Sequence, residues 1–279
     1  DPRADAPALL RGATTRIVYD LERFRRTQQA NPADPAAWQA VCAATLVRET
    51  HANALQPPHG LKIQVSFSYS DGYGREIQKK IQAEPGPLVE GGPILNLRWV
   101  GSGWTIFNNK GKPVRQYEPF FSFTHGFEFA VMHGVSSVLF YDPAGRVVVT
   151  LHPNHTFEKV VFDPWQQTTY DVNDTCAPRS QQPGDPRTDS DIGGYVGPYF
   201  QTQSTTWQTW YAQRITGAMG PHERNAALRA EAHADTPTTA HFDALGRPFL
   251  TVARNRVVCP SHALDGTEES FATRVELDI

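Results

Sequence analysis

A five-residue unit that recurs at irregular intervals constrains the fold of this chain more than any other feature of its sequence. Each copy begins with Asp or Asn, has Gly fourth and ends with a basic residue. An Asp or Asn side chain accepts backbone N–H bonds at the start of a turn, and Gly takes the left-handed conformation that closes a hairpin with a bulge. We therefore expect each copy to join two antiparallel strands. The copies are Asp71-Gly72-Tyr73-Gly74-Arg75, Asn108-Asn109-Lys110-Gly111-Lys112, Asp142-Pro143-Ala144-Gly145-Arg146 and Asp243-Ala244-Leu245-Gly246-Arg247, with a degenerate fifth at Asp163-Pro164-Trp165-Gln166-Gln167.

The segments that flank these turns have strand character. Residues 62–69 alternate apolar and polar side chains, which is typical of a strand with one buried face. After the first turn, Ile77 and Ile81 lie among polar residues and mark the returning strand. Further strands are expected at 14–21, 44–51, 95–100, 105–108, 138–141, 147–151, 156–162 and 248–252, and 276–279 also looks like a strand.

The pattern changes to helix after residue 204. In 205–215, apolar side chains recur every three or four residues, and Pro221 precedes a run of helix formers over 222–233. Two segments are rich in turn formers: 29–36 predicts a loop, and 173–191 predicts a mobile surface segment. The sequence thus predicts a hairpin region over 1–175, a flexible loop over 176–204, a two-helix insertion over 205–234 and a second hairpin region over 235–279.

Composition excludes several classes of protein. The 26 Lys+Arg are scattered and nearly balanced by 29 Asp+Glu, so no nucleic-acid or anionic-membrane partner is expected. No apolar run approaches the roughly 18 to 20 residues of a membrane span. The 3 Cys are far apart and predict neither a disulfide scaffold nor a metal knuckle. The first residues lack an initiator Met and a signal pattern, so we expect a piece of a longer chain.

Histidines and carboxylates offer two possible catalytic arrangements. His152 and His155 stand three apart and, with His125 and His133, are candidate metal ligands, although a turn with surface histidines is favoured. Glu118 and Glu128 are a candidate glycosidase pair whose separation the sequence does not fix. Nucleophile-elbow, P-loop and dinucleotide-binding motifs are absent from the sequence. No enzymatic activity, metal or cofactor is therefore expected.

Aromatic and arginine side chains suggest a binding alternative. Tryptophans stack on sugar rings in carbohydrate-binding β-proteins, but core packing is the favoured interpretation here. The repeat arginines would either bind an anion in a row or pair with the Asp of their own turn, and we favour the pairing. A carbohydrate- or receptor-binding β module remains the alternative function. The residues concerned are Trp99, Trp104, Trp165, Trp207 and Trp210 for stacking, and Arg75, Arg146 and Arg247 for the anion.

The recurring aromatic-Asp-x-x-Gly-Arg unit resembles the YD repeat of Rhs proteins. Longer stretches at 104–121 (WTIFNNKGKPVRQYEPFF), 139–174 and 206–213 (TWQTWYAQ) are similar to the B component of bacterial insecticidal toxin complexes. The middle stretches are highly specific, whereas the short repeat alone is not. The resemblance extends over about residues 10–279.

The resemblance implies a mainly β fold in which repeated antiparallel hairpins of an Rhs/YD-repeat spiral sheet form part of a hollow shell, with a small two-helix insertion. In that family the B component builds the shell with a C component, and the shell encloses the C component's toxic C-terminal region. A β-propeller of the B component docks on the A component. This chain resembles the B-side shell only, so its implied partners are the C component and, through its parent chain, the A component. The implied localisation is extracellular, after synthesis in the bacterial cytoplasm.

One motif is a superficial match to an enzyme of the same family. The C component's self-cleaving aspartyl protease has an Asp-Pro-x-Gly element, and Asp142-Pro143-Ala144-Gly145 has the same pattern. Here the element lies in the middle of a predicted hairpin. We interpret it as a turn and expect no protease activity.

Overall fold

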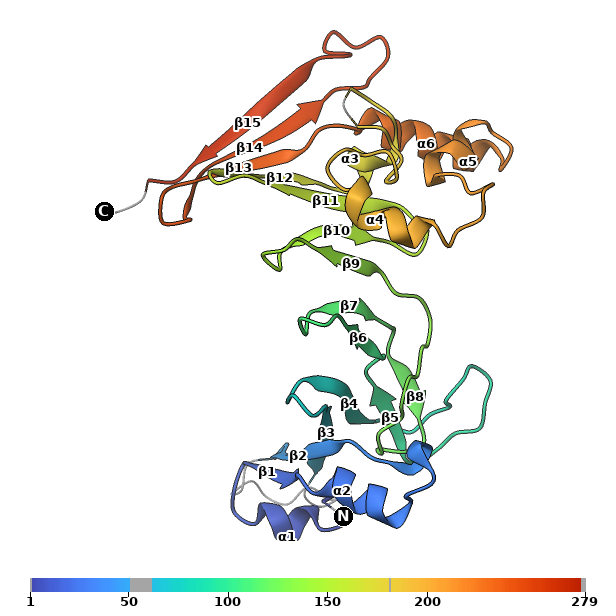
Figure 1. Ribbon diagram of the computed structural model, residues 1–279, viewed down its shortest axis with the longest axis vertical. Helices are drawn as coiled ribbons and strands as arrows, with labels where there is room; N and C mark the ends of the chain where they lie inside the picture. The colour runs from blue at the N-terminus through green and yellow to red at the C-terminus, as the bar shows by residue number, and fades with distance from the viewer. Residues whose placement is uncertain (1, 51–61, 181, 277–279) are drawn as a thin grey trace. The chain divides into compact units, whose positions relative to one another are not determined.

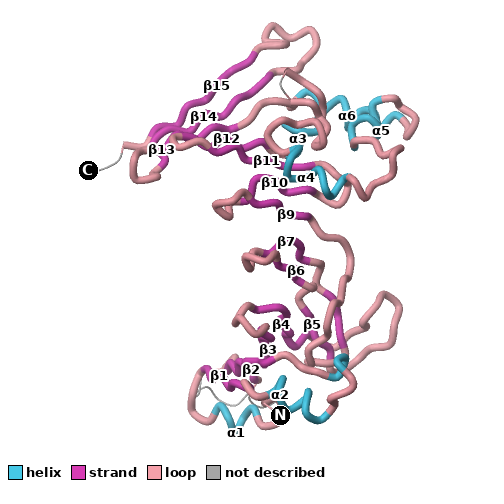
Figure 2. The backbone as a smooth tube through the Cα atoms, viewed as in Figure 1, coloured by secondary structure: helices cyan, strands magenta, loops and turns pink. Residues whose placement is uncertain are grey.

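The computed structural model describes residues 2–50, 62–180 and 182–276. The chain divides into two compact units, Asp1–Ser136 and Ser137–Ile279, called unit 1 and unit 2 below. Each is built mainly from antiparallel strands joined by short turns (Figures 1 and 2). The mainly β fold of repeated antiparallel hairpins is therefore confirmed.

Unit 1 contains a six-stranded antiparallel sheet in the order β1-β2-β3-β4-β5-β8. The strands β6 and β7 pair with each other as a further hairpin. The expected strand at 44–51 begins earlier and ends at Arg48, and its position 51 lies outside the described residues. The strands are β1 (Thr15–Asp20), β2 (Val41–Arg48), β3 (Ile63–Ser70), β4 (Glu76–Ala83), β5 (Arg98–Gly101), β6 (Thr105–Phe107), β7 (Pro113–Gln116) and β8 (Phe120–Ser122).

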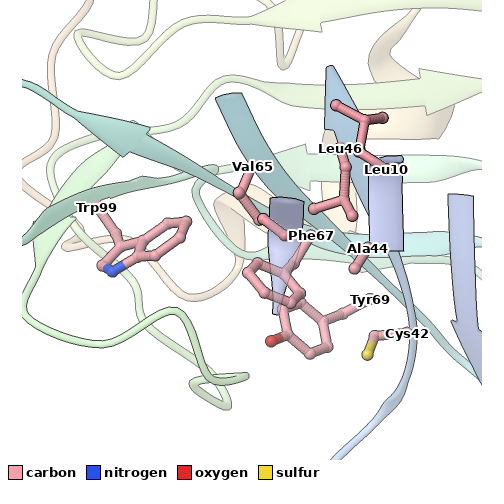
Figure 3. Packing of buried hydrophobic residues seen from close by; sticks show 9 residues of the cluster. Leu10, Cys42, Ala44, Leu46, Val65, Phe67, Tyr69 and Trp99 are labelled. Carbon is pink, nitrogen blue, oxygen red and sulfur yellow. The ribbon is translucent and has the colours of Figure 1, made fainter. Parts of the chain in front are cut away.

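The core of unit 1 lies on one face of this sheet (Figure 3). Alternate residues of β3 point to this face, as the pattern of 62–69 predicts, and pair across to small or apolar residues of β2: Val65 with Leu46, Phe67 with Ala44 and Tyr69 with Cys42. Helix α1 (Ala6–Leu10) adds Leu10, and β5 adds Trp99, which is fully buried.

The returning strand β4 is present, and its buried face carries polar side chains. Gln78 and Lys80 are fully buried, whereas Ile81 is 44% exposed. The turn bulge shifts the register between β3 and β4, so that Tyr69 faces Gln78 and Phe67 faces Lys80 on the core side. A shift of one residue reverses which side chains face the core. Two polar side chains thus enter the core, where other residues must satisfy them.

Unit 2 contains one antiparallel sheet in which the strands β9 to β15 pair in sequence order. Helix α4 packs on it by placing Ile192, Val196 and Phe200 in a cluster with Val149 and Phe157. The strands are β9 (Val138–Tyr141), β10 (Val147–Leu151), β11 (Phe157–Phe162), β12 (Gln166–Tyr170), β13 (Thr238–Phe242), β14 (Pro248–Arg256) and β15 (Glu268–Arg274); the helices are α3 (Val172–Cys176), α4 (Gly193–Phe200), α5 (Trp210–Ile215) and α6 (Pro221–Ala232).

The expected two-helix insertion is present with different bounds. The first helix, α5, begins at Trp210 rather than at residue 205, because the Thr209 side chain accepts the Ala212 N–H and caps it. The second helix, α6, begins at Pro221 as expected. The expected strand at 276–279 lies almost entirely outside the described residues.

Two segments expected to be loops are structured. Residues 23–30 form helix α2 (Arg23–Ala30), and Pro35–Ala37 is a 3-10 turn, so only part of 29–36 is a loop. Segment 173–191 is not a mobile surface segment, because Cys176, Ala177 and Asp189 within it are buried. A capping box between Asp171 and Asp174 starts α3 there. Among the described residues, no helix combines the length and the apolarity that a membrane crossing needs.

Candidate functional site

The repeat turns share one hydrogen-bond pattern. In the first, the Gly74 N–H donates to the Asp71 carbonyl (3.1 Å), and Asp71 Oδ1 accepts the N–H groups of Tyr73 (2.8 Å) and Arg75 (3.0 Å). Asn108, Asp142 and Asp243 each accept the N–H of the fifth residue in the same way. The glycines at the fourth position have φ of +77° at Gly74, +75° at Gly111, +82° at Gly145 and +74° at Gly246.

Arginine side chains close three of these turns. The guanidinium Nε of Arg146 donates to Asp142 Oδ2 at 2.7 Å, and Arg247 does the same to Asp243 at 2.8 Å. The backbone N–H of Arg146, together with its guanidinium, holds the pKa of Asp142 below its usual range. Asp142 is therefore an ionised turn anchor rather than a proton donor. Arg75 and Asp71 make the same pair in the first turn, at 2.6 Å.

Two of these arginines also brace the following hairpin. Arg75 lies over the ring of Phe107 at 4.5 Å, and Arg146 lies over the ring of Phe162 at 4.1 Å. Each ring belongs to the aromatic residue immediately before a later copy of the repeat, Phe107 before Asn108 and Phe162 before Asp163. A guanidinium on an aromatic face is attracted by the ring's electron density. At these two turns the arginine therefore links its own hairpin to a later one.

The two glycines of the first turn provide a matched test of this geometry. A Cβ added at either position meets no heavy atom within 4 Å, but only Gly74 has a positive φ, of +77°. We expect Gly74→Ala to lower the free energy of unfolding by about 1–2 kcal/mol, since an L side chain is strained there. Gly72→Ala should change it by less than about 0.5 kcal/mol. Urea unfolding of both variants measures the difference, and equal effects would contradict the turn assignment.

The other two turns of the series differ from the strict pattern. The degenerate copy at Asp163 is tighter, because the Asp163 N–H donates to the carbonyl of Gln166. The turn at 152–156 has the full set of backbone bonds, although the sequence does not show it as a copy: His152 N–H donates to the Thr156 carbonyl at 2.8 Å, and His155 N–H donates to the His152 carbonyl at 2.8 Å. His155, with φ of +63°, stands in the position of the repeat glycine.

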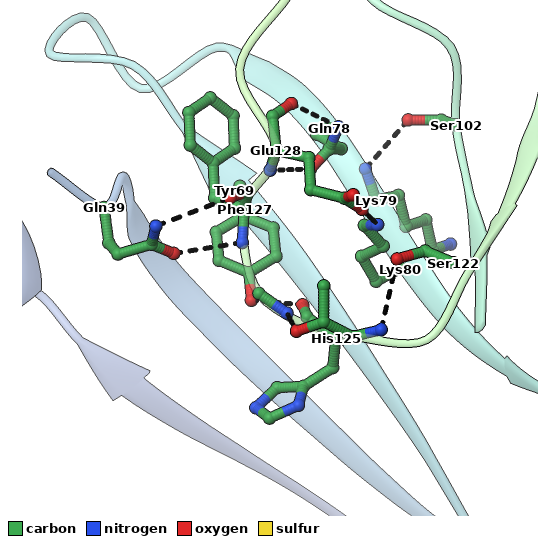
Figure 4. A network of polar contacts seen from close by, with 12 residues as sticks. Gln39, Tyr69, Gln78, Lys79, Lys80, Ser102, Ser122, His125, Phe127 and Glu128 are labelled. Atoms are coloured by element: carbon green, nitrogen blue, oxygen red, sulfur yellow. Dashed lines mark hydrogen bonds and ion pairs between the residues drawn. The ribbon is translucent and has the colours of Figure 1, made fainter. Parts of the chain in front are cut away.

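A strap, defined as residues 123–129, crosses the core face of unit 1 and is held by polar side chains of the sheet and its loops (Figure 4). The Gln39 amide accepts the Phe127 N–H (3.1 Å) and donates to its carbonyl (3.4 Å). Gln78 makes the same two bonds, both 2.9 Å, with Glu128. A side-chain amide with one donor side and one acceptor side thus replaces a strand partner at each residue.

Charge and aromatic contacts complete the attachment of the strap. Lys80 is fully buried and its ammonium pairs with the Glu128 carboxylate. Burial lowers the pKa of Lys80, and the hydrogen bond to Glu128 opposes that shift. The Tyr69 hydroxyl donates to the His125 carbonyl at 2.6 Å. These contacts satisfy the polar groups that the β4 register brings into the core.

We expect the half-buried His125 ring to make the stability of unit 1 depend on pH. The ring packs 4.5 Å from Phe67 and 5.4 Å from Trp99, and burial, followed by the nearby Arg23, lowers its pKa. The unfolded chain therefore binds the proton more tightly, and the stability that neutral His125 contributes is lost as pH falls below about 6.5. We expect the midpoint of urea unfolding to be lower at pH 5 than at pH 7.5. Hydrogen exchange of the β3 amides reports the unfolding of unit 1. His125→Gln should reduce this difference, and an unchanged difference would contradict the assignment.

In unit 2 a buried lysine holds segment 185–191 to the sheet. The Lys159 ammonium lies 2.8 Å from Asp189 Oδ2 and 2.7 Å from Asp191 Oδ2. The side chains of Lys159 and Asp189 are each 1% exposed, whereas Asp191 is 40% exposed. This pair fixes a segment whose composition alone predicts mobility.

The candidate catalytic residues are engaged in structural contacts. Within the described residues, no group of three or more His, Cys, Asp or Glu side chains is placed to hold a metal ion. His152 lies 3.3 Å from Glu158, and His155 is half-buried rather than a surface residue. Glu128 is paired with Lys80. The Glu118 carboxylate occupies the space beside Gly134 that a Cβ would need.

Most of the candidate tryptophans are also committed to packing. Trp99 is fully buried, and Trp104 packs 4.9 Å from Phe129. Trp207 donates a hydrogen bond to His155. Trp165, at 61% exposure, is the candidate that presents its ring to solvent.

Comparison with known proteins identifies solved structures with a similar fold. No protein-family model and no curated protein matches the chain. Among solved structures, the crystal structure of TcdB2-TccC3 aligns with a TM-score of 0.55 and 19% identity, over 95% of this chain and 10% of that chain. The chain has the fold of a segment of TcdB2-TccC3. It spans about a tenth of the length of the solved chain it matches.

Two further structures agree with this match. The Photorhabdus luminescens Tc holotoxin pore with the TccC3-D651A mutation aligns with a TM-score of 0.54 and 19% identity, over 91% of this chain and 10% of that chain. TcdB2-TccC3 without its hypervariable C-terminal region gives the same values. Nearly the whole chain therefore has the fold of one segment, about a tenth, of these solved chains.

Proposed function

We propose that this chain is a structural wall segment of an Rhs-type shell that encloses a toxic polypeptide in a bacterial insecticidal toxin complex. The observation that carries the proposal is the fold match to TcdB2-TccC3 over 95% of the chain. The linked hairpins supply a physical reason, because strands that pair in continuous series leave few free edges and form a wall. The enclosed polypeptide would be screened from solvent and from proteases.

The finer assignments follow from the sequence resemblance. The chain belongs on the B-component side of the shell, its partner there is the C component with the enclosed toxin, and the A component is reached through the parent chain. Its hairpin regions, 1–175 and 235–279, are the wall, and the helical insertion at 205–234 braces it. The repeat residues Asp71, Arg75, Asp142, Arg146, Asp243 and Arg247 fix the hairpins. The complex acts outside the bacterium.

A structural role is better supported than a catalytic or a glycan-binding one. The Asp-Pro-x-Gly element is a turn whose carboxylate is held by Arg146. Of the tryptophans considered for stacking on sugar rings, Trp99 is in the core and Trp207 is hydrogen-bonded to His155. Quenching of tryptophan fluorescence by glycans would favour the binding module instead.

Protease protection of an unstructured passenger tests the proposal. The passenger is fused to the matching C-type chain and co-expressed with the full-length parent of this chain. We expect it to survive digestion that destroys the same passenger alone. The matched control is a parent carrying Gly74→Ala and Gly246→Ala, which should weaken the protection. Equal digestion with and without the intact parent would refute containment.

A further inference from the structure

The β10–β11 turn of unit 2 carries a histidine where the repeat turns carry glycine. Its backbone bonds are those of the repeat turns, and His155 has a φ of +63° at the position that Gly145 fills with a φ of +82°. A non-glycine residue is disfavoured in this left-handed conformation. His is among the non-glycine residues that adopt this conformation more readily, and here its imidazole makes contacts that a glycine could not make.

Both ring nitrogens of His155 bind residues from the segment between β12 and β13. Trp207 Nε1 donates to His155 Nδ1 at 2.9 Å, and His155 Nε2 lies 3.0 Å from the Tyr199 hydroxyl. An indole N–H is a donor only. Nδ1 must therefore be the unprotonated acceptor, and the proton of the neutral ring is on Nε2, where it donates to Tyr199.

The surroundings keep the ring neutral. His155 packs between the rings of Tyr199, Phe200 and Trp207, with centroids 5.6–5.7 Å away. Burial lowers the pKa of His155. The charged and titratable groups nearby are Arg187, which lies 4.6 Å from the Trp207 ring and pairs with Asp185, and His152 of the same turn, whose Nε2 faces Glu158.

We propose that His155 is an acid-sensitive latch that holds segment 199–207 on the β10–β11 turn when neutral and releases Trp207 when protonated. The imidazolium carries a proton on both nitrogens, so Nδ1–H and the indole N–H would face each other as two donors, and the bond between them cannot persist. The latch is closed above about pH 6.5, the ordinary histidine pKa, and opens as pH falls below it. This inference does not depend on the proposed wall function.

Hydrogen exchange of residues 201–209 in the full chain tests the latch. After correction for the intrinsic pH dependence, we expect wild-type protection to fall at least tenfold between pH 7.5 and pH 5. His155→Gly keeps the left-handed turn but removes the imidazole, so it should exchange rapidly at both pH values. Equal wild-type protection at both pH values would overturn the proposal, as would His155→Gly protection equal to wild type at pH 7.5.

A second measurement needs only the wild-type protein. The 15N chemical shifts of the His155 ring report which nitrogen carries the proton. We expect the Nε2–H form at pH 7.5, with titration below the ordinary pKa of about 6.5. The Nδ1–H form, or titration at or above the ordinary pKa, would overturn the latch even if His155→Gly does not fold.

Discussion

Asp189→Asn should lower the free energy of unfolding of unit 2 by about 3 kcal/mol, since it leaves the Lys159 ammonium buried without its buried counter-charge. Both side chains are 1% exposed, so water does not replace the lost carboxylate. The amide keeps the oxygen that accepts the Asp191 N–H, so the substitution removes charge with little change in shape. Urea unfolding, monitored through hydrogen exchange of the β11 amides, measures the decrease in the free energy of unfolding.

Asp191 provides the matched control. It binds the same ammonium at 2.7 Å but is 40% exposed, so Asp191→Asn should cost less than about 1 kcal/mol. Lys159→Met should lower the free energy of unfolding less in the Asp189→Asn background than in the wild type. In that background both buried charges are removed, so neither is left unpaired. Equal costs for Asp189→Asn and Asp191→Asn would show that the buried pair does not fix this segment.

Trp99→Ala should destabilise unit 1 by about 3–5 kcal/mol, because it removes the largest fully buried side chain and leaves a cavity. The ring packs against Phe67 at 5.6 Å and against His125 at 5.4 Å, so both the sheet core and the strap lose a contact. The midpoint of urea unfolding, with exchange of β3 as the reporter, measures the effect.

Trp99→Phe distinguishes packing from polar contact at the same position. The indole Nε1 is buried and has no hydrogen-bond partner among the described residues. Replacing indole by phenyl therefore removes an unsatisfied donor together with part of the ring, and should cost less than half of the alanine effect. Equal costs for the two substitutions would contradict a packing role.

The hairpins could be predicted from sequence because their determinants are local. Asp142, Gly145 and Arg146 lie within one turn, and their hydrogen bonds do not require a distant partner. The alternation of Val65, Phe67 and Tyr69 likewise fixes which face of β3 is buried. The 152–156 turn does not match the repeat in sequence, because His152, His155 and Thr156 stand where the pattern has Asp or Asn, Gly and a basic residue.

The elements that the sequence does not predict depend on distant contacts. Helix α4 contains Gly193, Gly194, Gly197 and Pro198, which disfavour a helix, and it forms because its apolar residues are buried on the sheet. Segment 173–191 is ordered by Lys159, a residue well before it in the sequence. The buried face of β4 is set by a bulge, and Gln78 enters the core because strap residue Glu128 satisfies its amide.

A reconstruction by electron cryomicroscopy of the full-length parent bound to its C-type partner tests the wall assignment most directly. We expect β1 to β15 to lie within one continuous wall around a closed cavity, with β15 paired to a strand of the adjoining repeat. Density that places this segment outside the particle as a separate module, or a particle without an enclosed cavity, would contradict it.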